Sequence, residues 1–205
     1  MTNAIEAGLS KRRRVSSFVA WLARSLMRIL GWQLVGEAPD LPKYVLIAAP
    51  HTSNWDFPIM LALDFAFKVG CVWMGKDSLF RGPLGVYLRH MGGIPIDRSS
   101  ANNVVGQAVA AFQRHENMVM TIPPEGTRSL TRRWRTGFYY IALGAEVPIV
   151  CGFIDFKRKR TGFGPVLTPS GDIEADMAVI QDFYQDIEGK HPQNIGQVVV
   201  NPAEP

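Results

Sequence analysis

The sequence predicts an α/β fold, in which a mixed and largely parallel sheet is flanked by helices. Short continuous apolar runs alternate with longer segments of helical periodicity along most of the chain. Apolar runs without strict alternation are typical of strands that are buried on both faces of a parallel sheet. With 47% hydrophobic and 20% charged residues, the 205-residue chain is not largely disordered and has enough apolar residues for one sizeable core.

The N-terminus differs from the rest of the chain in charge. Residues 1–36 carry a net charge of +5, including the run KRRR at 11–14, whereas the remaining residues carry a net charge of −1. We expect residues 1–16 to form a flexible basic arm. Such arms bind anionic membrane surfaces or nucleic acid.

Residues 17–31 are predicted to form an amphipathic helix that associates with a membrane. Its large apolar side chains fall within one stripe about 120° wide, and Arg24 and Arg28 lie opposite. The stripe consists of Phe18, Val19, Leu22, Leu26, Ile29 and Leu30. The segment is too short to span a bilayer, which needs about 20 apolar residues, so we expect it to lie in the headgroup plane. The alternative is that the stripe packs on the protein's own core.

Residues 32–205 are predicted to form one domain of alternating strands and helices. A short connection through Pro39 and Pro42 leads to the apolar run at 44–49, which ends at Pro50 and indicates a buried strand. Further strands are expected at 70–74, 93–96, 118–122, 147–154 and 164–168. Helices are expected at 53–68, at 77–91 with an interruption at Gly82-Pro83, and at 101–115, 136–145 and 174–188. The last 15 or so residues have weak signals and stay unassigned.

His51 and Asp56 directly follow the first strand of this domain. Histidine suits proton abstraction near neutral pH, and a carboxylate on its other ring nitrogen fixes the tautomer. His51 precedes the expected helix, so its ring can fold back towards Asp56. The alternative is a capping box, with Ser53 as the N-cap and Asp56 three residues later. Taken alone, the pair fits both interpretations.

Two further segments have the chemistry of an anion site. Glu125-Gly126-Thr127-Arg128 follows the strand at 118–122; its glycine allows close backbone approach, and its arginine is a planar fork matched to phosphate oxygens. The alternative is an ordinary polar turn. Arg98 follows the short strand at 93–96, where a solvent-exposed arginine is the default.

In this order the motifs resemble those of the glycerolipid acyltransferase family, whose best-known members acylate lysophosphatidate. His51 and Asp56 match the HxxxxD block, residues 93–98 (GIPIDR) the second block, residues 124–129 (PEGTRS) the third, and residues 147–150 (VPIV) the fourth. The sequence departs from the common pattern at Pro50, Pro95 and Pro123. Because the second and third blocks read the acceptor, these departures leave its identity open.

The resemblance implies that His51 deprotonates an acceptor hydroxyl, which attacks the thioester of acyl-CoA or acyl carrier protein directly. Asp56 would orient His51, and Arg98 with Glu125, Gly126, Thr127 and Arg128 would hold the acceptor's phosphate. No metal or cofactor is implied. The expected product is phosphatidic acid, made from 1-acylglycerol-3-phosphate; other lysophospholipids, an amino-lipid acceptor and a non-catalytic lipid-binding role are the alternatives.

The expected partners are therefore a membrane lipid surface, the acyl donor and the lysophospholipid acceptor, and not nucleic acid. Cys71 and Cys151 stand outside any metal-binding spacing, and no secretory signal is visible. We expect the protein to be peripheral on the cytoplasmic face of a membrane.

Overall fold

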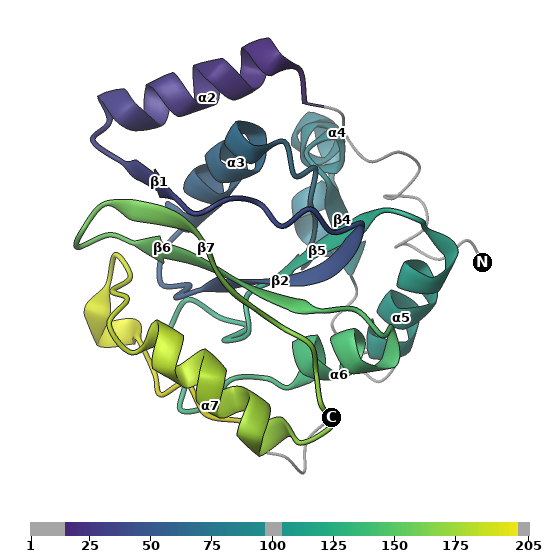
Figure 1. The fold of residues 1–205 in the computed structure, drawn as a ribbon. Coiled ribbons are helices and arrows are strands. Elements are labelled where there is room, and N and C mark those ends of the chain that lie inside the picture. Colours follow the sequence, from purple (N-terminus) through teal and green to yellow (C-terminus); the bar gives the residue numbers. More distant parts are fainter. Residues whose placement is uncertain (1–14, 97–103, 201–205) are drawn as a thin grey trace.

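The computed structural model of the protein describes residues 15–96 and 104–200 and has three layers (Figure 1). A central sheet separates α2, α3 and α4 on one face from α5, α6 and α7 on the other. Within the described residues, seven strands form this sheet in the order β1-β7-β6-β2-β5-β3-β4. The mixed α/β fold predicted from the sequence is confirmed.

The strands at the centre of the sheet are parallel. β2 lies between β5 and β6, and β3 joins β5 to β4. The antiparallel pair is β6–β7, and β1 runs parallel to β7 at the edge. The strands are β1 (Gln33–Val35), β2 (Lys43–Ala49), β3 (Val72–Lys76), β4 (Gly93–Ile96), β5 (Met118–Ile122), β6 (Ile149–Asp155) and β7 (Arg160–Leu167). Every residue of β6 is buried, which explains its unbroken apolar run.

The helices bury separate cores on the two faces of the sheet. Phe112 of α5, Phe138 of α6 and Met177 of α7 belong to the larger core, and Leu63 of α3 belongs to the core on the opposite face. The α-helices are α2 (Ser17–Ile29), α3 (Asp56–Phe67), α4 (Gly82–His90), α5 (Val104–Arg114), α6 (Gly137–Gly144) and α7 (Ile173–Tyr184). Two 3₁₀ helices, η1 (Asp77–Phe80) and η3 (Pro192–Asn194), complete the described elements.

Some boundaries differ from the sequence-based expectation. The expected connection after Gly31 contains β1, a three-residue strand that forms only because β7 lies beside it. The expected interruption at Gly82 is present, because η1 ends at Phe80 and α4 starts at Gly82. β7 begins at Arg160, earlier than expected, because it pairs with β6 from Asp155 onward.

The apolar stripe of α2 points away from the protein body. The buried face of the helix consists instead of Ala20, Ala23 and Met27. Met27 packs with Ile59 of α3 and Ile154 of β6. The stripe is exposed: Phe18 68%, Val19 37%, Leu22 51%, Leu26 51%, Ile29 81% and Leu30 53%. The alternative in which the stripe packs on the protein's own core is therefore wrong. Among the described residues, no helix is long and apolar enough to cross a membrane.

Candidate functional site

The candidate site lies at the carboxyl ends of two neighbouring parallel strands. Ile47 of β2 pairs with Ile122 of β5, so the loops that leave these strands meet at one edge of the sheet. The first loop carries His51 and leads into α3. The second carries Glu125 and Arg128. The register of the two strands therefore brings together motifs that lie 74 residues apart.

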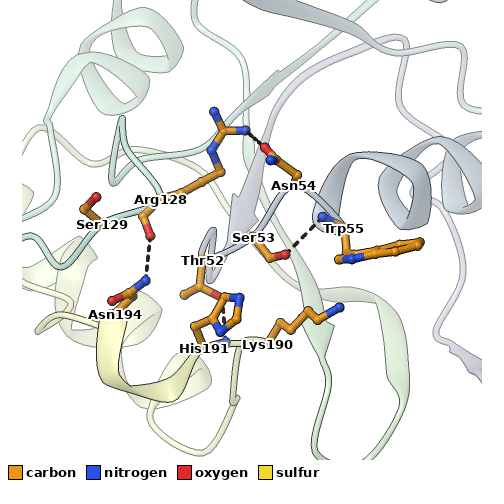
Figure 2. A pocket seen from close by; sticks show the side chains of 9 residues that line it. All are labelled: Thr52, Ser53, Asn54, Trp55, Arg128, Ser129, Lys190, His191 and Asn194. Carbon is orange, nitrogen blue, oxygen red and sulfur yellow. Dashed lines mark hydrogen bonds between the residues drawn. The ribbon is translucent and has the colours of Figure 1, made fainter.

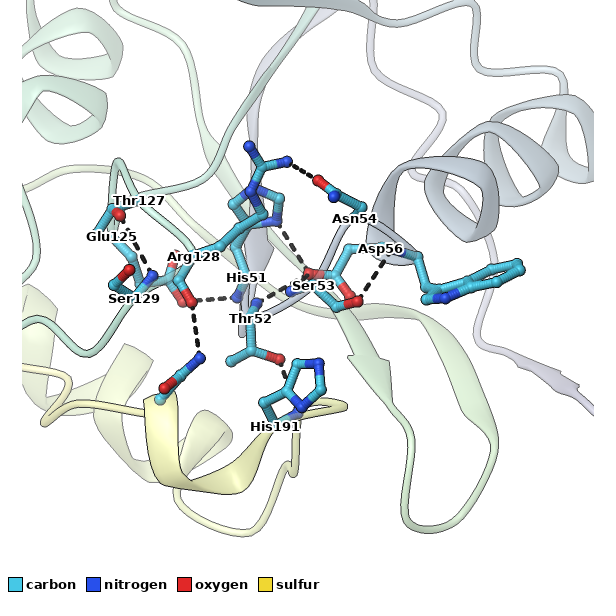
Figure 3. A network of polar contacts seen from close by, with 12 residues as sticks. His51, Thr52, Ser53, Asn54, Asp56, Glu125, Thr127, Arg128, Ser129 and His191 are labelled. Carbon is cyan, nitrogen blue, oxygen red and sulfur yellow. Dashed lines mark hydrogen bonds and ion pairs between the residues drawn. The ribbon is translucent and has the colours of Figure 1, made fainter.

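One carboxylate oxygen organises the first loop (Figure 3). Oδ2 of Asp56 lies 3.0 Å from Nδ1 of His51 and also accepts the backbone N–H groups of Thr52 and Ser53, at 2.9 Å each. Because an ionised carboxylate only accepts hydrogen bonds, Nδ1 of His51 carries the proton and Nε2 is left as an acceptor. The side chain of His51 is 24% exposed, whereas that of Asp56 is 5% exposed. This arrangement can perform general-base chemistry on a ligand that reaches Nε2.

The capping-box alternative describes this loop only in part. The helix starts at Asp56 and not at Ser53, and Trp55 is its N-cap without a side-chain cap. Asp56 does reach back to the N–H of Ser53, as in a capping box, but Oγ of Ser53 accepts from the N–H of Trp55. The same carboxylate thus fixes the loop and orients the histidine.

Glu125 connects the second loop to the first. Its Oε1 accepts the backbone N–H of His51 at 2.9 Å, and its side chain is buried. Burial raises the pKa of Glu125 from its ordinary value of 4.5 to about 6, against the lowering effect of the His51 hydrogen bond. Oε2 of Glu125 has no hydrogen-bond partner among the described residues, and neither has Oδ1 of Asp56. Two buried acceptor atoms near His51 are therefore left for other donors.

The turn after Glu125 brings Arg128 to the histidine loop. Gly126 has a φ of +66°, which favours glycine, and its N–H donates to the carbonyl of Pro123 at 3.2 Å. Oγ1 of Thr127 accepts from the N–H of Ser129, which tightens the exposed end of the turn. Nη1 of Arg128 donates to Oδ1 of Asn54, a residue that lies between His51 and Asp56 in the chain.

A C-terminal segment that sequence reasoning missed closes one side of the site (Figure 2). The N–H of His191 donates to Oγ1 of Thr52 at 3.2 Å, and Nδ2 of Asn194 donates to the carbonyl of Arg128 at 3.1 Å. Nζ of Lys190 lies 4.7 Å from the centre of the Trp55 ring. With both loops, this segment lines an open hollow of about 560 Å³. No local pattern in residues 189–194 marks it, because its partners lie far away in the sequence.

Arg98, the remaining candidate, lies outside the described residues. β4 ends at Ile96 on the same carboxyl edge of the sheet as β2, β5 and β3. Within residues 15–96 and 104–200, no cluster of three or more histidine, cysteine, aspartate or glutamate side chains could hold a metal ion.

Comparisons with known proteins concern the family and the fold of the chain. Residues 36–154 match a family model described as Acyltransferase. No curated protein gives a significant match to the sequence. Among solved structures, the fold is similar to that of the 1-acyl-sn-glycerophosphate acyltransferase PlsC from Thermotoga maritima, with a TM-score of 0.55 and 17% sequence identity. The alignment covers 86% of this chain and 81% of that chain, and at this identity the likeness concerns the fold.

Proposed function

Since the chain belongs to the acyltransferase family, we propose that it moves a fatty acyl group from acyl-CoA or acyl carrier protein to the hydroxyl of a lysophospholipid. The first acceptor we propose is 1-acylglycerol-3-phosphate, which would give phosphatidic acid. The observation that carries this proposal is the 3.0 Å contact between Nδ1 of His51 and Oδ2 of Asp56, held beside the turn that bears Arg128. The similar fold of an enzyme named for this acceptor supports it.

In the proposed mechanism, Nε2 of His51 removes the proton from the acceptor hydroxyl as its oxygen attacks the thioester carbonyl. The new ester C–O bond forms, the C–S bond breaks, and the proton passes to the departing thiol sulfur. Asp56 stabilises the imidazolium that exists between these steps. Glu125 holds the backbone of His51. We propose that Arg98 and Arg128, with Gly126 and Thr127, bind the acceptor's phosphate.

The exposed apolar stripe of α2 supports the proposal that the protein is peripheral on the cytoplasmic face of a membrane. Phe18 and Ile29 are more than two-thirds exposed, and Arg24 and Arg28 lie on the opposite side of the helix. A helix with apolar and cationic sides suits the boundary between acyl chains and anionic headgroups. An acceptor that resides in the bilayer would then meet the site without leaving the surface.

The test incubates the purified protein with acyl-CoA and 1-acylglycerol-3-phosphate and measures the release of free CoA together with the lipid product. We expect His51→Ala to abolish both signals. Equal CoA release by wild type and variant would refute the role given to His51. A panel of lysophospholipid and amino-lipid acceptors, compared by kcat/KM, identifies the acceptor. Transfer to no acceptor on the panel would instead favour a non-catalytic lipid-binding protein.

A further inference from the structure

The C-terminal segment adds basic side chains to the hollow beside His51. Lys190 and His191 line it together with Arg128, so the basic side chains come from two segments, 62 residues apart in the sequence, that the fold brings together (Figure 2). Hydroxyl and amide groups also line the hollow, from Ser53, Asn54 and Ser129 in the two loops and Asn194 in η3. The hollow thus combines two permanent cations, an imidazole and several neutral hydrogen-bonding groups.

The segment is built into the site at several points. The N–H of His191 and the side chain of Asn194 each bond to one of the two loops, to Thr52 and to the carbonyl of Arg128. Gly189 packs closely against Thr52, since a Cβ at Gly189 would lie 2.5 Å from Oγ1 of that residue. The segment is held further along the chain, where the N–H of Trp134 donates to the carbonyl of Val199 at 2.7 Å. These contacts fix the backbone from which Lys190 and His191 project.

The charge of the hollow is not neutralised within the described residues. No described carboxylate forms an ion pair with Arg128, Lys190 or His191. Nζ of Lys190 instead lies over the exposed ring of Trp55, 4.7 Å from its centre. A cation–π contact at an exposed position is weak. An anion that enters the hollow therefore competes easily for this ammonium group.

We propose that Lys190 and His191 form, with Arg128, a phosphate-binding subsite of the acyl-transfer reaction. The inference rests on the proposed function, because phosphate esters are present in both of its substrates: the headgroup of the acceptor and the coenzyme A part of the donor. Arg128 offers its planar fork, Lys190 a mobile point charge and His191 a ring N–H donor. Thr52 and Trp55 of the catalytic loop line the hollow, so a phosphate ester bound there lies next to the segment that carries His51.

Isothermal titration of the full chain with glycerol 3-phosphate and, separately, with coenzyme A tests this subsite. We expect Lys190→Gln and His191→Gln each to lower the affinity for one of the two probes by about 10- to 100-fold, the usual effect of losing a hydrogen bond to a charged group. Lys190→Arg should retain most of the affinity, because it keeps the charge. Arg132→Gln is the matched control, since it removes an exposed cation of the second loop that does not line the hollow.

The probe that loses affinity identifies the source of the phosphate: glycerol 3-phosphate assigns the subsite to the acceptor, and coenzyme A assigns it to the donor. Unchanged affinity for both probes in both variants, or no binding of either probe by wild type at millimolar concentration, would overturn the subsite. Acyl transfer is scored separately. A chain that transfers no acyl group, yet binds glycerol 3-phosphate in a Lys190-dependent way, would refute the proposed function and leave the subsite standing.

Discussion

The backbone N–H of His51 donates to Oε1 of Glu125 at 2.9 Å, which joins the loop after β2 to the loop after β5. Because Asp56 binds the ring of the same histidine, His51 is held from its backbone by one carboxylate and from its side chain by another. Both carboxylates are buried. The position of His51 therefore depends on two acidic groups, only one of which belongs to its own loop.

The ionisation of Glu125 should make the stability of the protein depend on pH. Its folded-state pKa of about 6 lies above the ordinary value of 4.5, so the unfolded chain releases this proton first as the pH rises. The contribution of Glu125 to the free energy of unfolding is thus fully present below pH 4.5 and falls by about 2 kcal/mol by the time the pH has passed 6. Glu125→Gln should remove this fall.

Denaturant unfolding of wild type and Glu125→Gln at pH 4 and pH 7 checks this prediction. The quantity of interest is the change with pH in the difference between the two proteins, because any constant effect of the amide cancels. A difference that stays the same at both pH values would mean that Glu125 is not held with a raised pKa.

Gly126 should be required for the geometry of the turn that carries Arg128. Its φ of +66° is strained for any other residue, and a Cβ there would lie 2.7 Å from Nε of Arg135. We expect Gly126→Ala to lower the free energy of unfolding by about 1–2 kcal/mol from backbone strain. The displacement of Arg135 should also move the turn, and so lower kcat/KM for acyl transfer.

Gly82→Ala is the matched control for Gly126→Ala. Gly82 has a similar φ of +64°, but nothing lies within 4 Å of a Cβ at that position. The Gly82→Ala variant should lose a similar amount of stability through backbone strain and keep its acyl-transfer activity. Equal losses of activity in both variants would show that backbone strain alone, and not the contact with Arg135, accounts for the effect at Gly126.

Local signals in the sequence were sufficient for the central sheet and for the two loops of the site. The apolar runs of β2, β5 and β6 mark buried strands because these strands lie in the middle of the sheet. The motifs at their carboxyl ends then fall at one edge, because neighbouring parallel strands end together. His51, Asp56, Glu125 and Arg128 could therefore be expected to lie near one another without the structure.

Features that depend on distant contacts could not be predicted. β1 is too short to show a pattern and exists through its pairing with β7. Lys190 and His191 follow α7 in a polar segment, and the bond from His191 to Thr52 joins residues 139 positions apart. The direction of the α2 stripe was also open, since periodicity defines an apolar face but not what covers it. Only the burial of Ala20, Ala23 and Met27 decides it.

Asp56→Asn should separate two roles of Asp56, which are to hold the loop in place and to stabilise positive charge on the ring of His51. The amide oxygen of asparagine can replace Oδ2 as acceptor for the N–H groups of Thr52 and Ser53, so the loop should stay folded. The negative charge that stabilises the imidazolium is lost, and we expect kcat to fall by about 10²- to 10⁴-fold. Steady-state kinetics and an unfolding curve of the same sample measure the two effects.

Asp64→Asn provides the comparison within the same helix. Asp64 is also buried in α3, where Oδ1 accepts the N–H of Cys71 at 2.9 Å. This variant should lose stability while kcat stays within about twofold of wild type, because Asp64 lies eight positions after Asp56 in α3 and its Oδ1 binds Cys71. If Asp64→Asn lowered kcat as much as Asp56→Asn, the loss at Asp56 would reflect general damage to α3.

Leu22→Ser/Ile29→Ser should weaken binding to vesicles that contain anionic lipid without unfolding the protein. Both side chains lie on the exposed stripe, at 51% and 81% exposure, whereas the buried residues of α2 are Ala20, Ala23 and Met27. Burial of apolar surface in the bilayer contributes about 25 cal/mol per Å². Removing two large side chains should therefore lower the partition coefficient by roughly 10- to 100-fold.

Val166→Ser/Val179→Ser removes two exposed apolar side chains of β7 and α7, at 49% and 47% exposure, and serves as the control. Because neither residue belongs to α2, the control should bind vesicles as wild type does. Sedimentation of the three proteins with the same vesicles gives the comparison. Equal loss in both variants would mean that exposed apolar area in general drives binding; no loss in the α2 variant would mean that another surface anchors the protein. Only a loss confined to the α2 variant assigns the membrane contact to the stripe.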